Sequence, residues 1–123
     1  MGGHTLNHCN LAEPRSSVQL RYEIAEDKMR LERITGRKVD YFAYPFGAFQ
    51  NPVMNVADLR ESDYRGALTI ISGFNSVGSS PYLLHRELTD ASMPGPVFRA
   101  RVYGNYDAVR FLKERVWVGL QRW

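Results

Sequence analysis

The chain has 123 residues, of which 44% are hydrophobic and 24% charged, a composition typical of one globular domain over residues 1–123 and not of a disordered chain. The net charge of +3 comes from acidic and basic residues that alternate along the chain, so a nucleic-acid partner is not expected. No apolar run approaches the roughly 20 residues of a membrane span, the first residues lack the pattern of a signal peptide, and the single Cys9 excludes an internal disulfide.

The first predicted helix follows residues 1–11, which we interpret as the end of a strand and a loop. Ser16 and Gln19 have the spacing of a capping box, which marks the start of a helix, and Gly36 is placed to end it. Apolar residues at helical spacing are predicted to form its buried face: Leu20, Ile24, Leu31 and Ile34.

The next segments alternate between strand and helix. Residues 39–44 are β-branched and aromatic, which predicts a strand, and residues 45–47 (Pro-Phe-Gly) end it in a turn. Asn51 and Pro52 are an N-cap and first-turn pair that predicts a helix through about Glu61.

The second half of the chain is interrupted more often. Residues 67–71 predict a short buried strand, residues 72–81 a loop rich in glycine and serine, and residues 82–88 a further strand. Residues 94–96 (Pro-Gly-Pro) predict another break. A final helix is predicted from about Tyr106, with one apolar face made by Val109, Leu112, Val116 and Leu120.

This alternation favours an α/β fold with parallel strands. The four predicted strands are fewer than a closed barrel requires. Either the sheet is open, or the chain forms a partial (β/α) barrel that lacks the first strands of the barrel, with its edges exposed or covered by a partner.

The first candidate site is the segment His-Thr-Leu-Asn-His, in which His4 and His8 are four residues apart. Two imidazoles at this spacing bind one cation if the backbone forms a tight loop. Because they follow a predicted strand, we place them at the carboxyl edge of the sheet, where parallel α/β folds carry their sites. On spacing alone, two histidines so close in the sequence are more often unrelated surface groups than metal ligands.

The second candidate site is the turn after the strand at residues 39–44. Tyr44, Pro45 and Phe46 predict a rigid apolar wall at the same edge of the sheet, and such walls suit the C–H faces of sugar rings. The alternative is that Phe42 and Phe46 belong to the core.

Taken together and in this order, these motifs resemble the polysaccharide deacetylases, also called carbohydrate esterase family four. The family motif His-(Ser/Thr)-x-x-His is matched by His4, Thr5 and His8. The capped helix that ends in Ile-Thr-Gly-Arg, residues 34–37, and the phrase Phe-Ala-Tyr-Pro-Phe-Gly, residues 42–47, are also similar. The sequence of this motif is most similar to the poly-N-acetylglucosamine deacetylase branch, and the resemblance covers roughly residues 1–90.

The resemblance implies a hydrolase that removes N-acetyl groups from an N-acetylated polysaccharide or oligosaccharide, with zinc or another divalent metal held by one aspartate and two histidines. His4 and His8 would be the two histidine ligands. His85, in a Leu-x-His pattern, would be the acid that protonates the leaving amine, and Arg86 is the alternative match at this point. The residues implied to contact the sugar are Tyr44, Pro45, Phe46 and Leu83. The family also implies a cell-envelope or secreted location.

The sequence departs from the family in two respects, of which one is that Ala43 stands where many members carry an arginine. The other concerns the metal site. The motif Thr-Phe-Asp-Asp-Gly, which supplies the general base and the aspartate ligand and is expected upstream of the histidines, has no match, so zinc is expected to be weakly held. Cys9, Asp40 and Asp90 are candidate substitutes for the third ligand. If Met1 is removed, residues 2–4 (Gly-Gly-His) predict instead a square-planar copper or nickel site.

Three hypotheses therefore stand. The first is a carbohydrate N-deacetylase that is incomplete as this chain, and the second is a non-catalytic deacetylase-like module that at most binds carbohydrate or self-associates. The third is an unrelated open α/β protein. For the first two, exposed strand edges and an apolar barrel interior predict a homo-oligomer.

Overall fold

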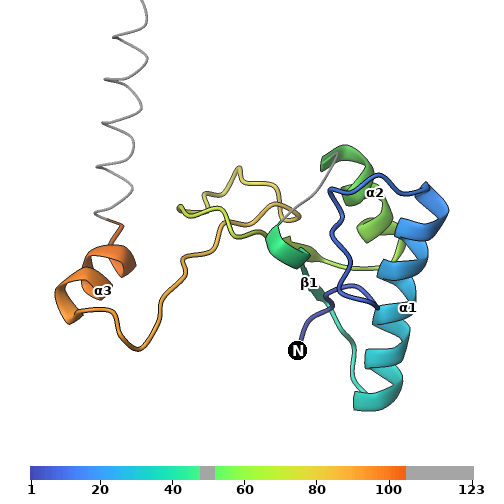
Figure 1. The fold of residues 1–123 in the computed structure, drawn as a ribbon, viewed down its shortest axis with the longest axis horizontal. Helices are drawn as coiled ribbons and strands as arrows, with labels where there is room; N and C mark the ends of the chain where they lie inside the picture. The colour runs from blue at the N-terminus through green and yellow to red at the C-terminus, as the bar shows by residue number, and fades with distance from the viewer. Residues whose placement is uncertain (48–51, 105–123) are drawn as a thin grey trace, which may run out of the picture.

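The computed structural model describes residues 1–47 and 52–104. In chain order the elements are helix α1 (Ser17–Thr35), strand β1 (Tyr41–Ala43), the short 3-10 helix η1 (Pro45–Gly47), helix α2 (Pro52–Glu61), strand β2 (Gly66–Leu68) and helix α3 (Gly95–Val102). Figure 1 shows α1 and α2 packed together beside the strands, whereas α3 lies at the far end of a long irregular segment. Among the described residues, no helix is both long and apolar enough to cross a membrane.

Helix α1 begins and ends as its sequence predicts. The Ser16 hydroxyl accepts a hydrogen bond from the Gln19 backbone N–H at 3.2 Å, and the Gln19 side chain accepts one from the Ser16 N–H at 3.3 Å. Gly36 ends the helix in the left-handed conformation (φ 62°), which costs glycine little. Both predicted helix boundaries are confirmed.

The predicted buried face of α1 is wrong at its carboxyl end. Leu20 and Ile24 are buried in the core, but Ile34 is 80% exposed. The last turn of α1 extends beyond α2 (Figure 1), so Ile34 has no second layer to pack against. The buried position one turn after Ile24 is instead Lys28, which is 8% exposed.

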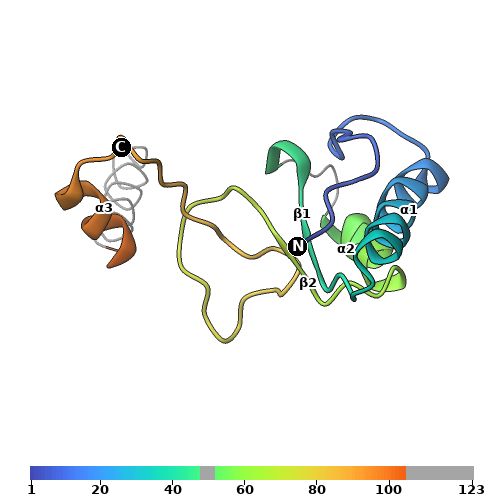
Figure 2. The same ribbon diagram turned by 90° about the horizontal axis from the view of Figure 1, so that it is seen from below.

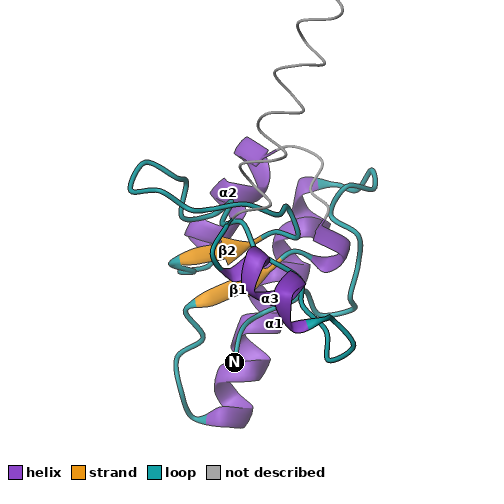
Figure 3. Cartoon of the chain, turned by 90° about the vertical axis from the view of Figure 1, so that its left-hand side faces the viewer, coloured by secondary structure: helices purple, strands orange, loops and turns teal. Residues whose placement is uncertain are grey.

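Strands β1 and β2 pair in parallel, as predicted, and lie side by side in Figure 3. Two isolated parallel bridges extend this pair, from Gly3 to Phe42 on one side and from Leu68 to Leu84 on the other. The parallel order is therefore Gly3, β1, β2 and Leu84, so consecutive segments of the chain are neighbours in space.

The strand predicted at residues 82–88 is reduced to the bridge at Leu84, and the strand predicted at residues 67–71 stops at Leu68. The Leu84 N–H donates to the Ala67 carbonyl, but the Arg86 N–H donates to the Ile71 carbonyl, so four residues of one segment oppose two of the other. The Thr69 hydroxyl accepts from the Ile71 N–H at 3.1 Å, a local bond that competes with the ladder. This mismatch ends regular pairing.

The core lies between the strands and the two helices that cover one of their faces (Figure 2). Phe42 and Ala67, at neighbouring positions of β1 and β2, are fully buried there. Tyr64 packs edge-on against Phe42, with ring centroids 5.4 Å apart. The Tyr64 hydroxyl lies over Gly3, where an added Cβ would stand only 2.0 Å from the phenol oxygen. This position therefore has no room for a side chain.

Helix α3 begins where the sequence predicted only a break. Pro94 is its N-cap and Pro96 occupies its first turn, a position that tolerates proline because the N–H there has no partner within the helix. No residue of α3 is buried, and Arg101 ties the helix to the preceding segment by donating to the Leu88 carbonyl at 2.6 Å. The helix predicted from Tyr106 lies outside the described residues.

Candidate functional site

The segment from His4 to His8 forms a tight loop directly after the Gly3 bridge, at the carboxyl end of β1. Thr5 (φ 62°) and His8 (φ 52°) both adopt the left-handed conformation, which costs roughly 1 kcal/mol or more for a residue with a side chain. Other contacts must offset this cost. One is internal to the loop, because the Thr5 hydroxyl accepts a hydrogen bond from the Cys9 N–H at 3.0 Å.

Helix α1 supplies the remaining support for the loop. The Glu23 carboxylate accepts from the Asn7 backbone N–H at 2.9 Å and from the Asn7 side-chain amide at 2.7 Å, and the Glu23 carbonyl accepts from the Leu6 N–H at 3.0 Å. One turn further along α1, the Asp27 carboxylate accepts from the His4 N–H at 2.7 Å. Both ends of the loop are therefore tied to one helix.

The two carboxylates that hold the loop differ in their electrostatics. Burial alone would raise the pKa of Glu23, but the hydrogen bonds from Asn7 outweigh burial and hold the pKa below its usual value. Burial raises the pKa of Asp27, and the hydrogen bond from the His4 N–H offsets this only in part. Glu23 is therefore the more firmly ionised of the pair.

The loop brings the two histidine rings together. The ring centroids of His4 and His8 are 4.7 Å apart, with their planes at 60°. His4 Nδ1 lies 2.7 Å from the Ala43 carbonyl, which can only accept, so Nδ1 carries a proton and Nε2 is the ring nitrogen left for another partner. A second hydrogen bond of this kind is what orients histidine ligands in metal sites.

Zinc in proteins favours four ligands. Two imidazoles in contact, one of them fixed by a carbonyl, fit as two of these ligands. Among residues 1–47 and 52–104, no group of three or more His, Cys, Asp or Glu side chains is placed to hold a metal. Cys9, Asp40 and Asp90 therefore do not complete the site, and burial raises the pKa of Cys9, which keeps its thiol protonated.

The copper or nickel site considered at residues 2–4 does not fit this fold. Such a site needs the backbone nitrogens of Gly3 and His4 together with His4 Nδ1. In the structure all three nitrogens are engaged in hydrogen bonds. The Gly3 N–H donates to the Tyr41 carbonyl, the His4 N–H donates to the Asp27 carboxylate, and His4 Nδ1 contacts the Ala43 carbonyl.

The aromatic turn lies against the histidine loop. Phe46 is 61% exposed and adopts a left-handed backbone (φ 57°), and its ring centroid is 4.7 Å from that of His8. Tyr44 is 1% exposed and its hydroxyl donates to the Tyr82 carbonyl at 3.0 Å, while Pro45 is buried and Leu83 packs partly buried against the core. Of the four predicted sugar contacts, Phe46 presents the largest free surface.

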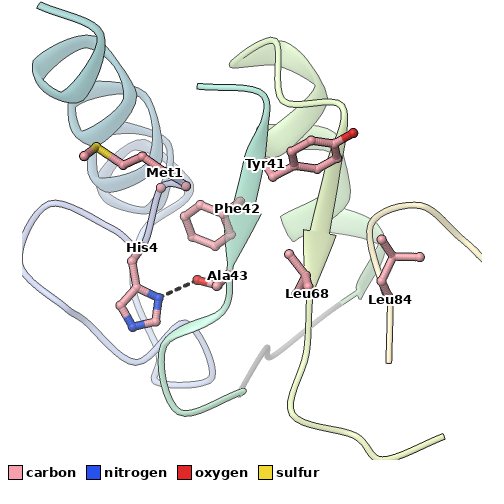
Figure 4. A pocket seen from close by; sticks show the side chains of 9 residues that line it. Met1, His4, Tyr41, Phe42, Ala43, Leu68 and Leu84 are labelled. Atoms are coloured by element: carbon pink, nitrogen blue, oxygen red, sulfur yellow. Dashed lines mark hydrogen bonds between the residues drawn. The ribbon is translucent and has the colours of Figure 1, made fainter. Parts of the chain in front are cut away.

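A cavity of about 630 Å³ opens beside His4, on the face of the strands away from α1 and α2 (Figure 4). Most of its lining is backbone and apolar side chains. His4 is the one titratable imidazole that borders it, with its ring turned toward Ala43. The lining residues are Met1, Gly2, Gly3, His4, Tyr41, Phe42, Ala43, Leu68 and Leu84.

His85 follows the Leu84 bridge and is held by its backbone. The Asn75 side chain accepts from the His85 N–H at 2.9 Å and donates to the His85 carbonyl at 3.0 Å. His85 Nδ1 and Arg86 Nε are both buried without a hydrogen-bond partner among the described residues. In that same part of the chain, no hydrogen bond or ring contact joins His85 to the histidine pair.

Sequence reasoning did not identify Glu23, Asp27 and Asn75 as part of the site. The one signal for the first two is their spacing of four residues on a predicted helix, which places them on one face. That Asn75 folds back onto His85 has no signal in the sequence.

Comparison with known proteins agrees with this geometry. Residues 1–65 match the profile of the polysaccharide deacetylase family. The chain therefore belongs to the polysaccharide deacetylase family, as the motifs around His4 and Phe46 predicted. No curated protein sequence matches the chain.

Several solved structures share the fold. The Streptococcus pyogenes deacetylase PplD, in complex with acetate, is 22% identical with a TM-score of 0.63, and the match covers 69% of this chain and 36% of that one. The BpsB deacetylase domain from Bordetella bronchiseptica is 19% identical with a TM-score of 0.55, covering 60% and 27%. A de-N-acetylase from Aggregatibacter actinomycetemcomitans is 15% identical with a TM-score of 0.57, covering 69% and 31%. This chain spans about a third of their length.

Proposed function

We propose that this chain carries part of the active site of a metal-dependent hydrolase that removes N-acetyl groups from an amino-sugar polysaccharide. The observation that carries the proposal is the contact between the rings of His4 and His8, with His4 Nδ1 fixed by the Ala43 carbonyl. Because Nδ1 is engaged by the Ala43 carbonyl, Nε2 is the His4 nitrogen that would bind a cation.

His4 and His8 would hold zinc or another divalent metal in this proposal. The metal, when bound, polarises the acetamide carbonyl and lowers the pKa of a water molecule. His85 is proposed as the acid that protonates the leaving amine, because its buried Nδ1 has no partner among the described residues.

The sugar is proposed to contact Phe46, whose exposed ring stands beside His8. Tyr44 and Pro45, the buried residues that precede this ring, and Leu83, which is partly buried against the core, are proposed as further sugar contacts. The sequence of residues 42–47 (Phe-Ala-Tyr-Pro-Phe-Gly) favours poly-N-acetylglucosamine as the substrate class.

The parallel order Gly3, β1, β2 and Leu84 supports a partial (β/α) barrel that lacks its first strands. Its open strand edges leave backbone groups uncovered, and the cavity beside His4 leaves apolar side chains uncovered. We propose that a second copy of the chain covers them. Light scattering should then report a dimer or larger oligomer, and a monomer with a cooperative thermal transition would contradict this.

The alternative is a non-catalytic module that binds N-acetylated sugar. It is favoured by one observation, namely that no third metal ligand joins His4 and His8 within the described part of the chain. The two functions predict different results in one assay.

The test is release of acetate from N-acetylglucosamine oligosaccharides by the full chain with added zinc, compared with the His8→Ala variant. Activity that is lost in His8→Ala supports the hydrolase. Zinc binding and sugar binding without acetate release support the module. A chain that binds neither zinc nor sugar would contradict both proposals.

A further inference from the structure

We infer that Glu23 and Asp27 of α1 are positioning residues that set the histidine loop in its metal-binding shape. This inference rests on the proposed function, because it concerns the same histidine pair. The two carboxylates lie one helical turn apart and accept hydrogen bonds from opposite ends of the loop, at Asn7 and His4.

The geometry of the loop makes such support necessary. His4 and His8 converge because Thr5 and His8 both adopt left-handed backbone conformations. A loop of ordinary residues leaves these conformations readily unless its N–H groups are held elsewhere. Here α1 accepts from the N–H groups of His4, Leu6 and Asn7.

The two carboxylates differ in how many of their oxygens accept hydrogen bonds from the loop. Glu23 uses both carboxylate oxygens as acceptors, one for the Asn7 backbone N–H and one for the Asn7 side chain. The contact from Asp27 to the loop uses one oxygen, which accepts from the His4 N–H. Glu23→Gln therefore keeps one acceptor for Asn7 but sets an NH2 donor against the other Asn7 donor, whereas Asp27→Asn keeps its one contact through the remaining carbonyl oxygen.

The experiment measures the affinity of the full chain for cobalt(II), a spectroscopic substitute for zinc. Glu23→Gln is expected to weaken binding about 10- to 100-fold, the usual effect of losing a group that orients a metal ligand. Asp27→Ala should do the same, and Asp27→Asn should restore affinity to within about threefold of the parent chain. Glu26→Gln is the matched control, because Glu26 lies on the same helix but pairs with Arg30.

A reciprocal exchange tests the Glu23 contact directly. Combining Glu23→Gln with Asn7→Asp reverses donor and acceptor, so that the introduced amide donates to the introduced carboxylate. This double variant should recover at least tenfold in affinity over Glu23→Gln alone. Asn7 is exposed, so Asn7→Ala, which removes one of the two bonds without disturbing the core, covers the case in which Glu23→Gln fails to fold.

The inference is overturned if Glu23→Gln binds cobalt as well as Glu26→Gln does, if Asp27→Asn is as weak as Asp27→Ala, or if the double variant shows no recovery. Failure of the parent chain to bind cobalt would instead contradict the proposed function. If the parent chain does not bind cobalt, the effect of Asp27 on the histidine loop is measured by amide hydrogen exchange of the metal-free chain. Exchange at His4 should rise about tenfold or more in Asp27→Ala. An unchanged rate would overturn the inference.

Discussion

Replacing Lys28 by methionine tests how the core of this small domain tolerates a charge. The Lys28 ammonium donates to the Val39 carbonyl at 3.0 Å and to the Asp63 carbonyl at 2.6 Å, and it stands 4.6 Å from the centre of the Tyr64 ring. Lys28→Met keeps an unbranched side chain that is one atom shorter and uncharged, and it leaves both carbonyls without this donor.

The expected loss follows from these contacts. Two hydrogen bonds from a charged donor are each worth roughly 1.5–3 kcal/mol, and the contact with the ring adds about 0.5–1 kcal/mol. Removing the ammonium also removes the cost of dehydrating it, which returns part of this sum. We therefore expect the free energy of unfolding to fall by about 2–4 kcal/mol.

The measurement is urea unfolding followed by circular dichroism, with Lys38→Met as the control. Lys38 also faces Asp63, at 3.9 Å, but its side chain is 81% exposed, so its loss should cost no more than about 0.5 kcal/mol. Equal effects of the two substitutions, or a gain in stability with Lys28→Met, would refute the view that Lys28 holds these two carbonyls.

Three further predictions concern the loops. The pKa of Glu23 is held below 4.5, so its ionised form stabilises the fold above about pH 4.5. This contribution should disappear as the pH falls through the folded-state pKa. Thermal melts between pH 3 and 6 should therefore show a smaller pH dependence in Glu23→Gln than in the parent chain. Gly47→Ala should lower the free energy of unfolding by about 1–3 kcal/mol in urea titrations, because φ is 65° and the new methyl group would stand 2.1 Å from Ile70. Asn75→Ala removes two hydrogen bonds to His85, so amide exchange at His85 should accelerate about tenfold.

Each of these predictions has a control. Gly78→Ala, at a glycine with no atom within 4 Å of the added carbon, should change stability by a few tenths of a kcal/mol, and a loss equal to that of Gly47→Ala would contradict the steric argument. An identical pH dependence in Glu23→Gln and the parent chain would contradict the linkage. Unchanged exchange at His85 in Asn75→Ala would show that Asn75 does not hold it.

Local signals in the sequence predicted local structure well. The Ser16 capping box and the glycine at position 36 defined α1 at both ends, because both act within a few residues of the helix terminus. The position of the histidine pair at the carboxyl end of β1 was also predictable, since parallel strands direct their following loops to one edge.

Signals that depend on distant partners failed. Ile34 has the spacing of a core residue but no neighbour to bury it, and Lys28 is buried because two carbonyls far along the chain accept from it. The strand expected at residues 82–88 depended on a register that the extra residues between Ala67 and Ile71 disrupt. The helix at Pro94–Gly95–Pro96 was missed because proline also favours the first turn of a helix.

The contact between Gly3 and the Tyr64 hydroxyl has a consequence for evolution and design. With 2.0 Å between that oxygen and any added Cβ, a side chain at position 3 requires a smaller residue at position 64. The two positions are 61 residues apart, yet we expect them to change together among related sequences. A designer who moves the histidine loop to another scaffold must therefore transfer the residue opposite Gly3 along with it.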